Sequence, residues 1–347
     1  MRVGIIASLL AFACSPAFET GDRRNGGNAH RSALMGINLS GGEFKGAENG
    51  ALLPNPGDLQ AYHDAGFRVF RIPFKMAQVQ SAPAKLAAIG AKCIQLQVPC
   101  IFDRHEYDWR KVPPSVPEWR AFLRLMPQSN LIQIDPMNEP KFFDSTMIPN
   151  DWDQWAVEAQ QWVTDMRGAG ITNPLWLEYA GSTAAFRFDK GERNGKDCDS
   201  AACALRKLPG GTIVDPLRRT GLQAHRYPDK NGSGANDYCY PYTSISAFAQ
   251  QAEAFGLPVM VGEIAFGSDR GMRDSCREFG EKVVAEMLAA DNLTYVTWWG
   301  GGRAWKRDYL FRTPATGDLP YIRMITGSNR TRRGDEPATD NTEGKTQ

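Results

Sequence analysis

The sequence predicts one α/β domain folded as a (β/α)8 TIM barrel. Short apolar or β-branched runs recur along the 347 residues, and helical patterns lie between several of them. Strands that alternate with helices form parallel sheets, and eight of them close into a barrel. A doubly wound sheet is the rival fold, but no Gly-x-Gly-x-x-Gly follows the first run and no phosphate-binding loop occurs. We therefore expect the barrel.

The strand candidates, in chain order, are 35–39, 69–74, 94–102, 131–134, 175–179, 221–225, 259–261 and 295–299. Apolar residues at helical spacing predict helices between several of these strands. The helix candidates are 56–65, 117–126, 152–166, 245–255 and 276–290. Asp151 is a good helix start, and Gly168 and Gly256 are good helix ends. The segment 186–216 falls outside this rhythm, and we expect a long loop there.

The composition limits the possible partners. The formal net charge is +1, so no strong field attracts nucleic acid or an anionic membrane. The hydrophobic content of 42% is ample for a large core. Beyond the N-terminal stretch, no apolar run reaches the ~18 residues that a membrane span needs. We expect a monomer with no nucleic-acid partner and no membrane span.

The N-terminus has the features of an export signal. Met1-Arg2 supplies a positive start, 3–13 is apolar, and a small-x-small pattern ends at Ala13. We expect cleavage near Ala13 or Ala17, and lipid attachment at Cys14 is the alternative. Either way the protein is expected to be secreted, to the extracellular space or the periplasm. The predicted parts are a signal peptide (1–17), a catalytic barrel (30–325) and a polar, disordered tail (326–347).

Cysteine usage agrees with export. The chain has seven cysteines, and without Cys14 an even number remains, which predicts disulfides in an exported protein, although six cysteines allow 15 connectivities. Zinc is the alternative, but the sequence has no Cys-x-x-Cys pair and its four histidines lie far apart. Closeness in sequence favours the pairs Cys93–Cys100 and Cys198–Cys203, which leaves Cys239–Cys276.

Two glutamates follow apolar runs where strands should end. Glu139 lies in Asn138-Glu139-Pro140 after the fourth run, and Glu263 lies in Val261-Gly262-Glu263 at the end of the seventh. The carboxyl ends of the strands form the face on which barrel active sites are built. Two carboxylates there are the minimal equipment for cleaving a glycosidic bond. One Asn-Glu-Pro can arise by chance, so the rest of the chain decides.

Polar and aromatic residues fall at the other strand ends. With the two glutamates they form an ordered set: Arg71, His105, Asn138, Glu139, His225, Tyr227, Glu263 and Trp299. In this set, over roughly 35–310, the sequence resembles glycoside hydrolase family 5, the cellulase-type retaining β-glycanases. It is most similar to the endoglucanase branch, which carries a His-x-Tyr followed by Asp and later Cys. Here that motif is His225-Arg226-Tyr227-Pro228-Asp229, running on to Cys239.

The resemblance implies a retaining mechanism. Glu263 would attack the anomeric carbon, and Glu139 would protonate the leaving oxygen and then activate water. Their carboxyls would have to lie about 5–5.5 Å apart. Arg71 is suited to keep Glu263 ionised, and the charge of Glu263 would raise the pKa of Glu139 so that it holds its proton. The alternative is a structural salt bridge between Arg71 and Glu263 in the barrel mouth.

Three further residues would position the substrate. By resemblance, Asn138 hydrogen-bonds the sugar 2-hydroxyl at the cleavage subsite, a contact that strengthens in the transition state. His105 and His225 would position sugar hydroxyls and the Glu139 side chain. The alternatives are a turn cap for Asn138 and structural roles for the histidines.

Two aromatic residues complete the predicted site. Tyr227 could donate a hydrogen bond to Glu263, or it is a half-buried aromatic whose hydroxyl is satisfied elsewhere. Trp299 would form the hydrophobic floor of the cleavage subsite. Trp298 points to the opposite side of the strand by alternation, so only one of the two can face the sugar.

The sequence departs from the family pattern at the rim. Glu106, in Asp103-Arg104-His105-Glu106-Tyr107, stands where the branch has a neutral amide near the substrate. We expect a secreted endo-β-1,4-glucanase that acts on a β-linked polysaccharide and uses no metal or cofactor. The same chemistry on mannan, xyloglucan or a bacterial exopolysaccharide is the first alternative. A silent glycan-binding barrel is the second, but a binding protein needs neither glutamate.

Overall fold

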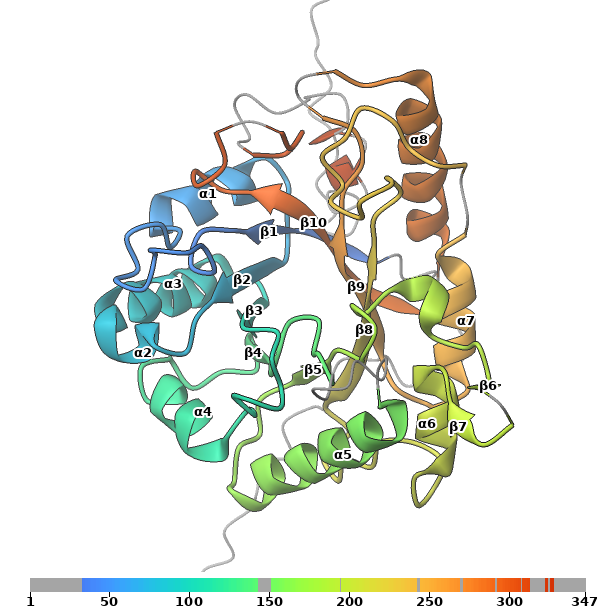
Figure 1. The fold of residues 1–347 in the computed structure, drawn as a ribbon. Coiled ribbons are helices and arrows are strands. Elements are labelled where there is room, and N and C mark those ends of the chain that lie inside the picture. The colour runs from blue at the N-terminus through green and yellow to red at the C-terminus, as the bar shows by residue number, and fades with distance from the viewer. Residues whose placement is uncertain are drawn as a thin grey trace, which may run out of the picture.

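The chain folds into a closed barrel of eight parallel strands, as the sequence predicts (Figure 1). The computed structural model describes residues 33–142, 151–193, 195–241, 244–268, 271–290, 292–306, 308–312, 322–323 and 325–327. The predicted signal peptide with Cys14, and residues 328–347 of the predicted tail, lie outside these residues. The first two residues of that tail, Thr326 and Gly327, are helical, and Thr326 is buried. The barrel strands are β1 (Leu34–Leu39), β2 (Phe70–Phe74), β3 (Cys100–Arg104), β4 (Ile132–Asp135), β5 (Leu175–Leu177), β8 (Thr220–Arg226), β9 (Val259–Ile264) and β10 (Leu293–Gly301).

Neighbouring barrel strands follow one another in the chain, and β10 closes the ring against β1. Helices surround the ring on the outside, and each of the five predicted helices is present (Figure 1). On β2, Phe74 stacks on Phe122 of the helix after β3, with 5.3 Å between ring centres. The helices are α1 (Pro56–Asp64), α2 (Gln78–Ser81), α3 (Pro83–Leu96), α4 (Val116–Leu123), α5 (Trp152–Gly168), α6 (Ala201–Lys207), α7 (Ser246–Glu253) and α8 (Asp274–Ala289).

The prediction for the third strand was wrong at its start. Residues predicted as strand from 94 are helical up to Leu96, the end of α3, and the strand begins only at Cys100. The buried positions Leu86, Ile89 and Cys93 repeat at helical spacing, so this apolar run belongs to a helix face. Gln97 ends the helix in the left-handed conformation, with φ of 55°.

The segment predicted as a long loop, 186–216, contains regular structure. The short strands β6 (Glu192–Arg193) and β7 (Asp197–Cys198) pair antiparallel, and α6 follows them. The Ser200 side chain caps α6 by accepting from the backbone N–H of Cys203. The apolar face of α6 is buried, and this packing stabilises the helix. The stretch is too short for its apolar residues to show a clear helical spacing in the sequence.

The three disulfides join the cysteine pairs that the sequence predicts: Cys93–Cys100, Cys198–Cys203 and Cys239–Cys276. The first ties the last turn of α3 to the start of β3. The third links the loop after β8 to the first turn of α8, across 37 residues of chain. One disulfide therefore ties a helix to the strand that follows it, and another ties the loop after β8 to an outer helix.

Two layers of side chains fill the lumen of the barrel. Side chains two residues apart on a strand point to the same side of it. The lower layer is apolar and consists of Val69, Ile101, Trp176, Met260 and Tyr295. Two residues later on four of these strands stand buried polar side chains, namely Arg71, Asp103, Glu178 and Thr297. The polar layer therefore lies at the carboxyl end of the barrel and rests on an apolar floor.

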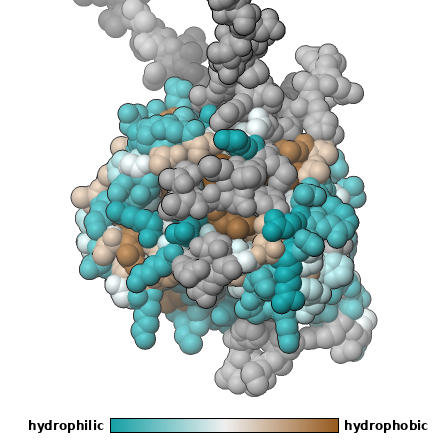
Figure 2. Space-filling model, turned by 90° about the horizontal axis from the view of Figure 1, so that it is seen from above, coloured by the Kyte–Doolittle hydropathy of each residue, from teal (hydrophilic) through white to brown (hydrophobic). Residues whose placement is uncertain are grey.

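The coloured part of the face in Figure 2 is mainly hydrophilic. Figure 2 shows one face of the molecule, on which hydrophobic side chains form only small patches. Phe186 is 61% exposed, and the cations of Arg187 and Lys190 lie 5.8 and 5.2 Å from its ring centre. Within the described residues, no helix combines the length and the apolar character that crossing a bilayer requires.

A buried ion pair fixes the amino end of β8. Asp215 accepts two hydrogen bonds of 2.9 Å from Arg167 of α5 and one of 2.8 Å from the Thr220 hydroxyl. Burial opposes ionisation of Asp215, but these donors lower its pKa to about 2. The pair therefore stabilises the fold above the ordinary pKa of an aspartate, and this contribution is lost as pH falls toward 2.

We expect Asp215→Asn to lower the free energy of unfolding at pH 7 by about 2 kcal/mol, because the charge that Arg167 binds is removed. The difference from the wild type should shrink at pH 3. Urea unfolding at both pH values measures it. Asp274→Asn is the control, since Asp274 is fully exposed and should change stability little. An equal loss at both pH values would contradict the assignment.

Candidate active site

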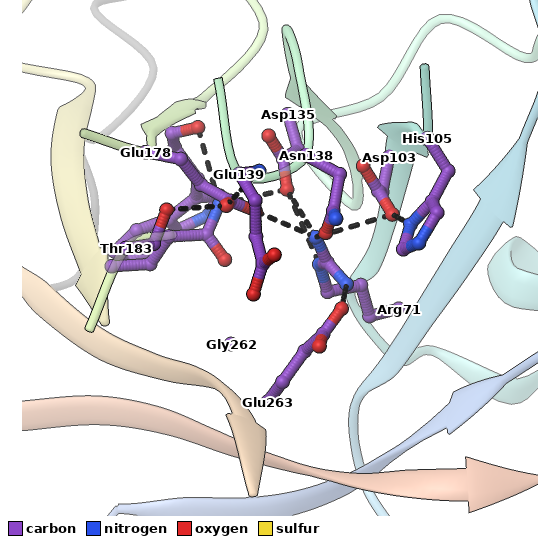
Figure 3. A network of polar contacts seen from close by, with 12 residues as sticks. Arg71, Asp103, His105, Asp135, Asn138, Glu139, Glu178, Thr183, Gly262 and Glu263 are labelled. Carbon is purple, nitrogen blue, oxygen red and sulfur yellow. Dashed lines mark hydrogen bonds and ion pairs between the residues drawn. The ribbon is translucent and has the colours of Figure 1, made fainter. Parts of the chain in front are cut away.

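Arg71 is the centre of the candidate active site (Figure 3). Its side chain is fully buried, and its guanidinium donates to side chains from several strands. The acceptors are Asn38 Oδ1 (3.0 Å), Asp135 Oδ2 (2.9 Å), Asn138 Oδ1 (2.8 Å), Glu178 Oε1 (2.7 Å) and Glu263 Oε1 (2.7 Å). Asp103 adds an ion-pair contact of 3.1 Å. One side chain therefore connects most of the polar layer.

The backbone around Glu263 explains the Val-Gly-Glu motif. Glu263 lies on β9 and pairs in register with His225 of β8. At the preceding Gly262, a Cβ atom would lie 2.0 Å from Gln223 Oε1, so a larger residue requires movement. The Gly262 carbonyl also accepts a 2.8 Å hydrogen bond from Asn38 Nδ2. Glycine thus lets β9 pack closely on its neighbours and sets the position of Glu263.

The Glu263 carboxylate is held from two sides. Arg71 donates to Oε1, and the Tyr227 hydroxyl donates to Oε2 over 2.5 Å. Burial opposes ionisation of Glu263, but the charges of His225, Arg71 and His105 lower its pKa below the ordinary value. Glu263 is therefore an ionised, oriented carboxylate at neutral pH, as a nucleophile must be.

Glu139 follows β4 and reaches the same space from another side (Figure 3). Its backbone is in the left-handed region, with φ of 40°, and its N–H donates to Glu178 Oε2 over 2.6 Å. The side chain is 21% exposed, and Oε1 lies 3.1 Å from His225 Nδ1. One oxygen of Glu139, one of Glu263 and a ring nitrogen of His225 all lie within 4.8 Å of one another.

The environment separates the two glutamates in acidity. Burial raises the pKa of Glu139, and the charges of Glu263 and Glu178 raise it further, against the opposing effect of His225. The pKa of Glu263 is lowered. Two neighbouring carboxyls, one with a raised pKa and one with a lowered pKa, are the arrangement of an acid and a nucleophile.

The two histidines are buried between carboxylates. His225 Nδ1 lies 3.1 Å from Glu139 and 3.5 Å from Glu263, and Nε2 lies 3.4 Å from Glu178. Burial disfavours the charged ring of His225, yet the charges of Glu178 and Glu263 raise its pKa well above the ordinary value. His225 is therefore a cation that lies beside the carboxylates of Glu178 and Glu263 and the carboxyl of Glu139.

His105 is held by its neighbours on both sides. Nδ1 lies 2.6 Å from Asp103 Oδ2, and Nε2 lies 2.7 Å from the Tyr107 hydroxyl. Both ring nitrogens are thus engaged within the protein. The imidazole stacks on the indole of Trp299, with 5.5 Å between ring centres and 17° between planes.

The two tryptophans of β10 point to opposite sides, as alternation requires. Trp298 is fully buried and packs against Phe266 and Phe311 on the outside of the barrel. Trp299 stands on the inner side at the carboxyl end and is 8% exposed. Its edge contacts Trp305, at 6.3 Å between ring centres. Only Trp299 lies with the site residues.

Glu106 is turned toward other protein groups. Its carboxylate lies 2.5 Å from Arg104 Nε and accepts from the backbone N–H of Met76 over 3.3 Å. The departure from the neutral amide of the family pattern therefore comes with a cation, Arg104, that balances the added charge.

Three groups of side chains bring potential metal ligands together: Asp103, His105 and Glu263; Glu139, His225 and Glu263; and Asp103, Asp135 and Glu178. Each carboxylate in them lies in ion-pair contact with Arg71, His105 or His225. The protein itself supplies the cations that these carboxylates need.

The structure brings together every residue of the predicted site. It adds Asn38, Asp103, Asp135 and Glu178, which sequence reasoning did not assign to the site. The signal for them was present, because each is a polar residue within or directly after an apolar strand run. Glu178, for example, follows Leu175-Trp176-Leu177.

Solved structures share the fold. The endo-β-1,4-glucanase of Xanthomonas axonopodis pv. citri superposes with a TM-score of 0.69 at 22% identity, over 86% of this chain and 99% of that one. XacCel5A, solved in complex with cellopentaose, gives a TM-score of 0.66 at 22% identity, over 85% and 99% of the two chains.

Two related proteins match at a similar level of sequence identity. The probable endo-β-1,4-glucanase B of Aspergillus oryzae is 22% identical over 84% of this chain and 88% of its own length. Endoglucanase 3 of Humicola insolens is 23% identical over 83% and 74%. The family model "Cellulase (glycosyl hydrolase family 5)" matches residues 32–303, a stretch that contains every site residue described above. The chain is thus a glycoside hydrolase and belongs to glycosyl hydrolase family 5.

Proposed function

We propose that the protein is an exported, monomeric endo-β-1,4-glucanase that cleaves its substrate with retention of configuration. The observation that carries the mechanism is the closeness of Glu139 and Glu263, whose nearest oxygens lie within 4.8 Å. Retaining enzymes need carboxyls about 5–5.5 Å apart, whereas inverting enzymes leave roughly 6.5–9.5 Å for a water molecule. The separation supports double displacement.

In the first step, Glu263 attacks the anomeric carbon and the glycosidic C–O bond breaks. Glu139 gives its proton to the leaving oxygen. In the second step, Glu139, now a carboxylate, takes a proton from water, whose oxygen attacks the same carbon and displaces Glu263. The lowered pKa of Glu263 and the raised pKa of Glu139 suit these starting states.

The choice of substrate rests on the relatives, two of which are named endoglucanases, and on XacCel5A, which was solved with cellopentaose. Export is supported by the predicted signal peptide and by three disulfides, which persist in oxidising compartments. Another β-glycan is the second candidate, because Glu106 and Arg104 form an ion pair where the family has an amide.

A panel of soluble substrates tests the proposal. We expect reducing ends to appear from carboxymethyl cellulose faster than from mannan or xyloglucan. Proton NMR of the first product should show the β anomer. Preference for mannan or xyloglucan would move the assignment to the second candidate, and no release from any of them would refute hydrolysis of β-glycans.

Tyr227→Phe should lower kcat by about 10- to 100-fold, because a hydrogen bond to a charged group is lost. Without this donor the pKa of Glu263 rises, so the acid limb of the kcat/KM profile should move to higher pH. Tyr295→Phe is the matched control, since the Tyr295 hydroxyl contacts Gln133 in the apolar floor and not Glu263. An unshifted acid limb would exclude Tyr227 as a group that helps to lower the pKa of Glu263.

Glu139→Ala removes the proposed acid, so hydrolysis of substrates with poor leaving groups should fall by about 100- to 10,000-fold. Aryl glycosides with activated leaving groups should still react in the first step, and the glycosyl–Glu263 intermediate should accumulate. Azide needs no base and should restore turnover, with a β-glycosyl azide as product by NMR. An α-azide would indicate inversion, and no rescue together with no leaving-group dependence would make Glu139 a structural carboxylate.

A further inference from the structure

Glu178 is a buried carboxylate that the proposed mechanism does not use. It directly follows β5, is 1% exposed, and belongs to the polar layer above Trp176. Buried charges are costly unless they are paired and hydrogen-bonded. We propose that Glu178 is the positioning residue for Glu139: it fixes the backbone of the acid/base residue and holds the charge of the His225 ring beside it. This inference rests on the role proposed above for Glu139.

Both oxygens of Glu178 are used, and each faces a different part of the site (Figure 3). Oε2 accepts from the backbone N–H of Glu139 over 2.6 Å and from the Thr183 hydroxyl over 2.7 Å. Oε1 accepts from Arg71 Nη2 over 2.7 Å and lies 3.4 Å from His225 Nε2. One carboxylate therefore joins the acid/base residue to the two cations that flank the nucleophile.

The contact with Glu139 acts on a strained backbone. Glu139 has φ of 40°, a left-handed conformation that an L-residue other than glycine adopts only under strain. Such a conformation persists only where the surroundings fix it. The hydrogen bond from the Glu139 N–H to a charged acceptor is of the strong class, and it holds the turn that aims the Glu139 side chain at Glu263.

The contact with His225 acts on charge. His225 Nδ1 lies 3.1 Å from Glu139 Oε1. The protonation state of the His225 ring therefore decides whether Glu139 lies beside a cation or beside a neutral ring. Titratable and charged groups face Glu178 and His225 from several elements. They are Arg71 on β2, Asp103 on β3, His105 directly after β3, Asp135 on β4, Glu139 after β4, Tyr227 after β8 and Glu263 on β9. Among them, Glu178 is the carboxylate placed at Nε2, the nitrogen that faces away from Glu139.

An amide cannot replace this carboxylate. The four partners of Glu178 are the Glu139 N–H, the Thr183 hydroxyl, the Arg71 N–H and the His225 ring, and each of them is a donor when His225 is charged. A glutamine keeps the shape but presents an NH2 group to one side or the other, where it meets donors. Glu178→Gln is therefore a sharp test that changes charge and hydrogen bonding with little change of volume.

The test compares Glu178→Gln with Asp215→Asn. Asp215 is the matched control, since it is also a buried carboxylate that binds an arginine and a threonine hydroxyl, but at the other end of the barrel. We expect kcat of Glu178→Gln to fall about a hundredfold with KM nearly unchanged, since a small misplacement of a reacting group costs this much. The loss should be larger for poor leaving groups than for activated aryl glycosides.

A second readout needs no substrate. The chain has only four histidines, so the ring of His225 can be followed by NMR after histidine-selective 15N labelling. In the wild type and in Asp215→Asn, His225 should stay charged through neutral pH. In Glu178→Gln it should lose its proton at lower pH. This readout holds even if the wild type hydrolyses no glycan, so failure of the proposed function and failure of this inference are distinguishable.

Should Glu178→Gln not fold, Thr183→Val tests the same arrangement. It removes one donor to Glu178 Oε2 at nearly constant volume and keeps the charge, so the same leaving-group dependence should appear in weaker form. Wild-type kcat in Glu178→Gln together with an unshifted His225 titration would overturn the inference. With Thr183→Val as the only folded variant, wild-type leaving-group dependence would overturn it.

Discussion

The site depends on one guanidinium that cannot give up its proton. Arg71 is fully buried, and an arginine stays charged even there. Its fixed fork of donors reaches groups from β1, β4 and β9 and from the turns after β4 and β5, so the carboxyl ends of these strands share one partner. Removing one member of such a buried network typically costs about 3–5 kcal/mol, because the remaining charges lose their partner. Arg71 therefore stabilises the fold as well as arranging the site.

Around this fixed charge, chemically similar carboxyl groups have different pKa values. Burial alone raises the pKa of every buried acid. Glu178 and Glu263 lie against both Arg71 and His225, and these cations lower the pKa of each. For Asp135, burial and the charges of Glu178 and Asp103 raise the pKa well above the ordinary range, against the opposing charge of Arg71. Arg71 and His225 thus favour the ionised forms of Glu178 and Glu263, whereas the pKa of Glu139 is raised, as the proposed acid requires.

The sequence predicted the barrel and the glutamate pair because both leave local signals: apolar runs, and carboxylates where those runs end. It could not place the start of β3, because the apolar residues before Gln97 fit a helix face as well as a strand. It also missed Glu178: a polar residue after an apolar run marks a strand end, but the partner of Glu178, Arg71, lies on β2, far away in the sequence. Long-range pairing of this kind leaves no periodic trace in one chain. The Cys198–Cys203 pairing was predictable from closeness alone, whereas the helix between 201 and 207 was not.

The two-layer lumen has a consequence for how this enzyme's lineage can vary. Four polar side chains of the lumen stand two residues beyond a floor residue, as Arg71 does beyond Val69. A one-residue insertion between them would turn the functional side chain to the outer face of the barrel. Connections between strands carry no such constraint and tolerate changes in length. The spacing within the strands is thus a constraint on length, and a shared fold at 22% identity is compatible with it.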